Sequence, residues 1–137
     1  MTIRIAEPYN VVVACMPLRY DIDTGHHIVI ITGDYAEPSE WRTLLTAIGA
    51  DPQYGPGYGF LRDLRASAHP VSAETVIGII AVVREFWIRL GARRAAILTR
   101  HGIDLPAAVA HALAEDANLP LRAFSDMDDA LAWLNGV

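Results

Sequence analysis

The chain has 137 residues, of which 53% are hydrophobic and 20% are charged, and its formal net charge is −5. This composition excludes an intrinsically disordered chain, and the length predicts a single domain over residues 1–137. All 11 basic residues are arginine, which excludes Schiff-base lysine chemistry and a P-loop. The negative charge argues against nucleic-acid binding as the main activity, because that binding depends on clustered cations.

The single cysteine, Cys15, cannot form a disulfide within the chain, which favours the cytoplasm as the compartment. The apolar run at residues 11–18 contains Pro17 and follows a segment with little positive charge. It therefore predicts a buried strand rather than a secretory signal. The apolar run at residues 76–83 is too short to span a bilayer, so no membrane span is expected.

Residues 18–23 alternate between apolar and polar side chains, and residues 27–34 contain an apolar run rich in β-branched residues. Between them lie the turn formers Thr24-Gly25-His26. This pattern predicts a β-hairpin. The residues before it, 1–17, are expected to form either a separate arm or an extra edge strand. Asp23-Thr24-Gly25 is also the triplet of aspartic proteases, but a hairpin turn explains Asp and Gly at these positions without catalysis.

Apolar residues recur at helical spacing after Pro38, which suits a first helical turn. This helix is predicted to end at Gly49 or at Asp51-Pro52, and its apolar face consists of Trp41, Leu44, Leu45 and Ile48. Residues 51–59 are mostly breakers and aromatics, which predicts a structured loop, and residues 60–64 predict a short strand. The glycines of that loop lack the spacing of a dinucleotide-binding motif.

The longest predicted helix runs from Ser72, its expected N-cap, to Leu90, and Gly91 ends it. At about 100° per residue, one apolar face consists of Val76, Ile79, Ile80, Val83, Phe86, Trp87 and Leu90. A further strip widens the apolar arc to roughly 200°, more than a helix lying on a sheet requires. This strip consists of Ile77, Ala81 and Ile88, with Arg84 among them. We therefore expect something else to cover it.

Strands and helices alternate in the C-terminal third of the chain. Strands are predicted at residues 95–99 and 120–124, a helix capped by Asp104 at residues 105–117, and a last helix capped by Ser125. Strands that alternate with helices imply a largely parallel sheet joined by right-handed crossovers, with the hairpin adding antiparallel edge strands. The predicted fold class is therefore α/β.

Catalytic and metal-binding residues give only weak patterns. Asp63, Ser67 and His69, with Arg65 between them, lie close together in sequence after a predicted strand. They would suit a small hydrolase if the fold brought nucleophile, base and acid together. The histidines and Cys15 have no ligand spacing, so no metal site is expected. No cofactor is expected either.

Three segments resemble the small bacterial STAS-like (SpoIIAA-like) proteins. They are Asp51-Pro52-x-Tyr54-x-Pro56-Gly57-Tyr58-x-x-Leu61-x-Asp63-Leu64-Arg65, Ile30-Ile31-Thr32-Gly33 and Phe124-x-Asp126-x-x-x-Ala130-x-x-Trp133-Leu134. Their order agrees with the predicted elements, and the resemblance covers about residues 18–134. It implies a SpoIIAA-like mixed sheet, the fold of anti-sigma factor antagonists, of the cytoplasmic domains of anion transporters and, more distantly, of lipid-exchange domains.

In the anti-sigma antagonists of this fold, a partner kinase phosphorylates a serine at the start of the helix that follows the Asp-Leu strand. The resemblance places Ser72 at that position. Val71, Ala73 and Glu74 replace the residues that surround the family's serine, and Glu74 would repel a phosphate that the helix dipole favours. Ser72 is thus expected to cap the helix, with a phospho-switch as the alternative.

These features favour a non-enzymatic cytoplasmic domain that binds or regulates a partner. We expect a homodimer that acts through a surface near the central helix, formed by Tyr54, Tyr58, Ile77, Ala81, Arg84 and Ile88. Other possible occupants of this region are a different protein and a small apolar ligand held between the aromatic loop and Phe86 and Trp87. The phospho-switch and the small hydrolase are the alternative functions.

Overall fold

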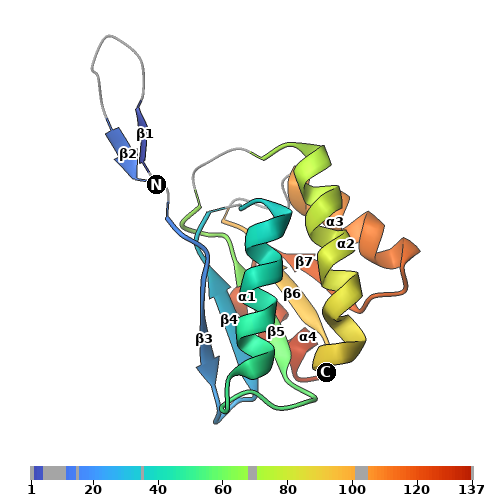
Figure 1. Cartoon of the computed structure of the whole chain (residues 1–137). Helices are drawn as coiled ribbons and strands as arrows, with labels where there is room; N and C mark the ends of the chain where they lie inside the picture. The colour runs from blue at the N-terminus through green and yellow to red at the C-terminus, as the bar shows by residue number, and fades with distance from the viewer. Residues whose placement is uncertain are drawn as a thin grey trace.

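The computed structural model describes residues 2–4, 12–14, 16–34, 36–67, 71–100 and 105–136. A five-stranded sheet with the order β3-β4-β5-β6-β7 lies at its centre (Figure 1). The strands are β3 (Arg19–Asp23), β4 (Ile28–Thr32), β5 (Gly59–Asp63), β6 (Ala95–Leu98) and β7 (Leu121–Phe124). β3 and β4 pair antiparallel, and the other neighbours pair parallel. The predicted α/β fold, a hairpin followed by a parallel sheet, is confirmed.

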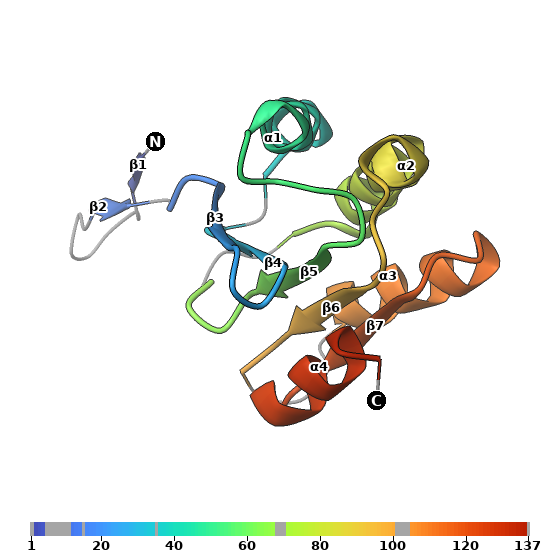
Figure 2. The ribbon, with the colours of Figure 1, turned by 90° about the horizontal axis from the view of Figure 1, so that it is seen from below.

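The helices lie on both faces of this sheet. One face carries α1 (Pro38–Ala50), α2 (Ala73–Leu90) and α3 (Leu105–Asp116), and the other carries α4 (Met127–Leu134) (Figure 2). Right-handed crossovers between parallel strands that follow one another in chain order place every connecting helix on the same face. α2 therefore lies between α1 and α3 and contacts both. This strand order and helix arrangement give the domain a SpoIIAA-like topology.

Alternate residues of the strands contribute to two different cores. In β4, Val29 and Ile31 pack toward α1–α3, whereas Ile28 packs toward α4. α2 buries one side against the first core, through Val76, Ile79, Ile80, Val82, Phe86 and Leu90. Most of these residues belong to the predicted apolar face. Val82 was not assigned to it, and it is buried because α1 packs beside α2.

α2 begins and ends at the predicted residues. The Ser72 hydroxyl oxygen accepts a hydrogen bond from the Thr75 backbone N–H at 3.1 Å, and Gly91 ends the helix with φ 62°. A Cβ atom on Gly78 would lie 2.6 Å from Pro38 Cγ in the first turn of α1. The missing side chain therefore lets α1 and α2 approach closely, and Gly78 lies at their contact.

The start of α4 corrects one prediction. The N-cap is Asp126 rather than Ser125, and its carboxylate accepts a hydrogen bond from the Asp128 backbone N–H at 2.8 Å. Aspartate is at least as good a cap as serine, and its charge also meets the positive end of the helix dipole. Asp104, the predicted cap of α3, lies outside the described residues.

The residues before the sheet include a hairpin of their own. β1 (Thr2–Arg4) and β2 (Val12–Ala14) pair antiparallel in a separate two-stranded sheet, which Figure 1 shows beyond one end of the domain. β3, not β2, is thus the edge strand of the five-stranded sheet. Cys15 lies outside the described residues. No helix in the part of the chain that the structure describes is long and apolar enough to cross a membrane.

Candidate functional site

Four residues form a line along the solvent side of α2, and we call them the outer ridge: Ile77, Ala81, Arg84 and Ile88. Their spacing of four, three and four residues keeps them within about 60° of one another around the helix axis. All four are exposed, Ile77 by 51% and Ile88 by 90%. These two isoleucines are the large hydrophobic side chains exposed among the described residues. The outer ridge is therefore open to a partner.

Charged side chains border the outer ridge on the side of α1. Arg42 of α1 donates to both carboxylate oxygens of Glu85, and this contact lowers the pKa of Glu85 below its usual value. The Cζ atoms of Arg42 and Arg89 lie 5.7 and 4.7 Å from the centre of the Phe86 ring, which is buried. An apolar strip with a charged border is the usual anatomy of a protein interface.

The aromatic loop, residues 51–59, packs against the C-terminal end of α2. The Tyr54 ring centre lies 5.3 Å from that of Tyr58 and 5.9 Å from that of Phe60, and its hydroxyl donates to Leu90 O at 2.6 Å. Both tyrosines are half-buried and pack on the core beneath α1–α3. The predicted surface thus divides into an exposed outer ridge and two tyrosines that are engaged in local packing.

Burial raises the pKa of Tyr54 to about 12, which leads to a prediction about pH. An unfolded tyrosine titrates near pH 10, so the raised pKa of Tyr54 stabilises the folded state below about pH 10. This stabilisation is lost as the pH rises from about 10 to about 12.

We expect Tyr54→Phe to lower the free energy of unfolding by about 1 kcal/mol at neutral pH, because the hydrogen bond to Leu90 O is lost. The variant should also lack the part of the stability decrease at alkaline pH that the titration of Tyr54 causes in the wild type. Urea unfolding across this pH range is the measurement. Tyr58→Phe, which removes a hydroxyl from the same stack, should retain the decrease. Equal alkaline losses in the wild type and Tyr54→Phe would contradict the prediction.

A polar cluster lies at the carboxyl edge of the sheet, where β4 and β5 end. We call it the edge cluster: Asp34, Arg62, Ser67 and the backbone of Met16. Arg62 Nη1 donates to Gly33 O at 3.0 Å, and Nη2 donates to Asp34 O at 3.2 Å. The Asp34 carboxylate accepts from Met16 N at 2.7 Å and from Ser67 Oγ at 3.1 Å. Asp34 and Arg62 are buried, so these hydrogen bonds hold the segment before β3 against the sheet edge.

The weak catalytic candidates have different partners at this edge. The Asp63 carboxylate accepts two hydrogen bonds from the Arg65 guanidinium at 3.0 Å, whereas Ser67 donates to Asp34. His69 lies outside the described residues. Among the residues that are described, Ser67 and Asp63 thus have different hydrogen-bond partners, Asp34 and Arg65.

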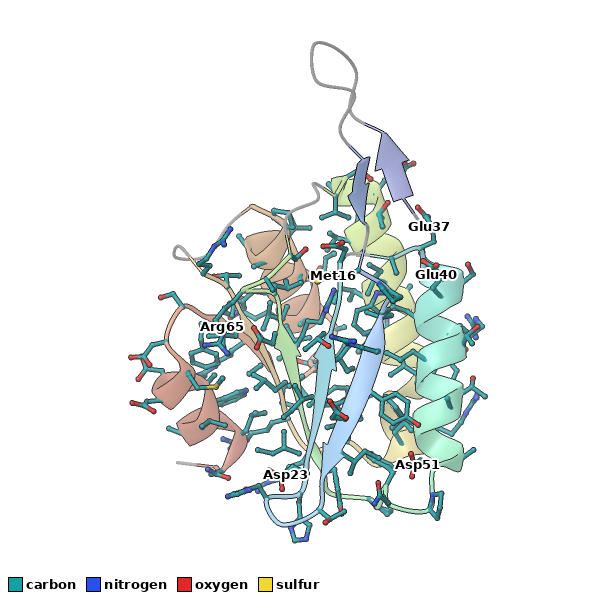
Figure 3. The ribbon with its side chains drawn as sticks, turned by 90° about the vertical axis from the view of Figure 1, so that its left-hand side faces the viewer. Met16, Asp23, Glu37, Glu40, Asp51 and Arg65 are labelled. Atoms are coloured by element: carbon teal, nitrogen blue, oxygen red, sulfur yellow. The ribbon has the colours of Figure 1, made fainter. Side chains whose placement is uncertain are left out.

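The Asp23-Thr24-Gly25 triplet lies at the opposite end of the sheet. Figure 3 shows Asp23 at that end, and Met16 and Arg65 toward the other. Asp23 Oδ1 accepts a hydrogen bond from the His26 backbone N–H at 3.0 Å within the β3–β4 connection. The triplet therefore forms the hairpin turn, as predicted.

Neither the fold nor these contacts identify a family by themselves. No family model, curated protein or solved structure matches this chain. In the described ranges, no three metal-ligating side chains gather in a group that could hold a metal ion. Any function must therefore be inferred from the geometry of the described residues.

Sequence reasoning named Ser67 as a candidate but missed the edge cluster to which it belongs. The sequence does contain a signal that Arg62 is buried. Arg62 lies two residues after Phe60 and two before Leu64, so in an extended strand its side chain points to the same face as these two apolar residues. An arginine between two core positions is buried only where hydrogen bonds satisfy it. The signal for Asp34 is weaker, since an acidic residue after a strand and a glycine is also typical of an exposed loop.

Proposed function

We propose that this chain is a non-enzymatic, cytoplasmic STAS-like regulatory domain that functions as a homodimer joined along the outer ridge. The observation that carries the proposal is the 90% exposure of Ile88, in line with Ile77, on the central helix of its layer. Burying such a side chain in an interface contributes about 1.5–3 kcal/mol. The SpoIIAA-like topology and the three resembling segments support the STAS-like assignment.

The spacing of the outer ridge favours a second copy of this chain as the partner. Ile77 and Ile88 lie equally far from the point midway between Val82 and Val83, and so do Ala81 and Arg84. If two α2 helices pack antiparallel about a two-fold axis at this point, Ile77 faces Ile88 of the partner subunit. The small Ala81 then faces Arg84 of the partner subunit, which leaves room for its long side chain. The ridge thus complements itself, as an isologous interface requires.

Light scattering over a range of concentrations tests the dimer. We expect the wild type to dimerise and Ile88→Arg to weaken the dimer affinity by about 100-fold or more. The substitution is present in both subunits of the interface, and it adds a positive charge beside Arg84. Ala66→Arg, which adds the same charge in the exposed loop after β5, should leave the affinity unchanged. A wild-type monomer at high concentration, or an Ile88→Arg dimer of unchanged affinity, would overturn the proposal.

A phospho-switch at Ser72 is the second candidate function. In its favour, Ser72 is exposed at the N-terminus of the helix that carries the outer ridge, where the helix dipole favours a phosphate. If the switch acts on the proposed dimer, Ser72→Asp should change the dimer affinity in the same light-scattering series. Ser72→Ala is the control for loss of the cap. An unchanged affinity in Ser72→Asp would remove this candidate.

A further inference from the structure

Three arginines gather at the C-terminal end of α4, and we call them the arginine cluster: Arg93, Arg94 and Arg122. The Cζ atoms of Arg94 and Arg122 each lie 4.2 Å from the centre of the Trp133 ring. Their guanidinium carbons are therefore no farther apart than twice this distance. Arg93 joins them, because its Nη2 lies against Gly136, just beyond α4, where a side chain would clash with it.

The fold holds this cluster in place. Leu121 and Ala123 pack into the core beneath α1–α3, so the alternation along β7 directs Arg122 to the side of α4. Trp133 Nε1 donates to a carbonyl oxygen of β6 at 3.0 Å, and Arg94 Nη1 donates to Trp133 O at 2.8 Å. The ring and the two guanidinium groups over it are thus positioned by contacts within the domain.

The arginine cluster carries a local positive charge without a described counter-charge. None of its three members forms an ion pair with a carboxylate in the part of the chain that the structure describes. Arg42 and Arg65, by contrast, pair with Glu85 and Asp63. Like charges at this separation repel one another, and an anion bound between them would relieve the repulsion. The cluster therefore favours a negatively charged ligand.

The C-terminal end of α4 accounts for only one of the three arginines. A cation is favourable beside the last carbonyl groups of a helix, and Arg94 fills this role through its hydrogen bond to Trp133 O. The side chains of Arg93 and Arg122 are exposed, and they donate to no acceptor among the described residues. Because a guanidinium has five N–H donors, the cluster retains donors for a ligand.

We propose that the arginine cluster binds the phosphate group of a small soluble molecule. A guanidinium presents two parallel N–H groups that match two phosphate oxygens, and a phosphate can accept from more than one arginine at once. The cluster and the outer ridge lie on opposite faces of the sheet, since α4 packs on one face and α2 on the other (Figure 2). This proposal and the proposed dimer can therefore fail independently.

The surroundings of the cluster favour a soluble molecule over a membrane or a nucleic acid. The large exposed hydrophobic side chains, Ile77 and Ile88, belong to α2, so no such side chain lies beside the cluster among the described residues to enter a lipid surface. Binding to a nucleic-acid backbone depends on a longer row of cations, and acidic residues outnumber basic ones in this chain by 16 to 11.

Nuclear magnetic resonance of the full chain, titrated with inorganic pyrophosphate at constant ionic strength, tests the site. We expect saturable shifts of the side-chain N–H signals of Arg93 and Arg122. The side-chain N–H signals of Arg19 should not follow them, because Arg19 lies on β3, at the opposite edge of the sheet from β7. Chloride at the same ionic strength should cause no saturable shift. Absence of saturation with pyrophosphate, or equal shifts at Arg19, would overturn the proposal.

Two variants and a matched control locate the binding. Arg122→Gln and Arg93→Gln each remove one exposed guanidinium and should weaken pyrophosphate binding about 5- to 20-fold. Arg19→Gln makes the same change in net charge and should weaken it by less than about 2-fold. Equal effects of all three substitutions would show a response to net charge alone and would contradict the proposal.

Vesicles that contain phosphatidic acid and a single-stranded RNA oligomer separate the possible sources of the phosphate. At equal concentrations of phosphate groups, we expect neither to bind more tightly than pyrophosphate. Tighter binding of the vesicles would assign the arginine cluster to a membrane surface, and tighter binding of the RNA would assign it to nucleic acid. Either result would overturn the proposal of a small soluble ligand.

Discussion

Gly33→Ala is expected to lower the free energy of unfolding by about 3–5 kcal/mol, a large share of the stability of an ordinary domain. Gly33 has φ +105°, in a region that side chains rarely adopt, and an added Cβ would overlap the carbonyl oxygen of Pro17. It would also lie 2.9 Å from Leu18 Cα. These neighbours are backbone atoms, so no rotamer change can relieve the contact.

Gly57→Ala is the matched control for this prediction. Gly57 also has a positive φ, +89°, but nothing lies within 4 Å of an added Cβ. It should lose only about 1–2 kcal/mol, the cost of the backbone conformation. Urea unfolding followed by circular dichroism measures both variants. Similar losses in Gly33→Ala and Gly57→Ala would mean that the contact with Pro17 does not constrain the fold.

The helices and strands of this domain follow closely from the sequence because their signals are local. The hydroxyl of Ser72, the apolar period of α2 and the left-handed Gly91 lie within one continuous segment, and the structure uses each of them as predicted. The exposure of the strip that contains Ile77 and Ile88 could be predicted for the same reason. An apolar arc wider than one sheet can cover is a property of the helix sequence alone.

The edge cluster could not be predicted in this way because its members are distant in sequence. Met16, Asp34 and Ser67 meet only after β4 and β5 pair side by side, and no local period relates them. A cavity of about 80 Å³ between the sheet and α1–α3 is equally non-local, since its walls require all three helices on the same face of the sheet. The N-cap of α4 shows a smaller limit, because Ser125 and Asp126 are adjacent and both suit that position.

The aromatic loop shows how tertiary contacts can reverse an expectation from composition. Tyr54 and Tyr58 lie among glycines and prolines, and a loop of that kind is usually exposed. Here the Gly57 backbone N–H donates to Gly91 O at 2.8 Å, and the Tyr54 hydroxyl donates to Leu90 O. The loop therefore closes onto the carbonyl groups at the end of α2, and the tyrosines support that helix instead of extending the outer ridge.

Arg62→Met is expected to lower the free energy of unfolding by about 2–4 kcal/mol, because methionine keeps much of the side-chain volume but donates no hydrogen bond. The carbonyl groups of Gly33 and Asp34 would lose the guanidinium donors that now lie 3.0 and 3.2 Å away. Both residues are buried, so water cannot easily replace those donors. The loss should therefore exceed that from removing an exposed ion pair.

Arg65→Met provides that comparison, because it makes the same substitution three positions along the chain. Arg65 is exposed, and its guanidinium donates to Asp63, so its loss should cost about 0–1 kcal/mol. Urea unfolding of the two variants under identical conditions gives the difference directly. Equal losses would show that the buried hydrogen bonds of the edge cluster contribute no more than a surface ion pair. A clearly larger loss of stability in Arg62→Met would show that Arg62 joins the end of β5 to the end of β4. Because Asp34 also accepts a hydrogen bond from Met16 N, Arg62 would then help to hold the segment that leads to the β1–β2 hairpin.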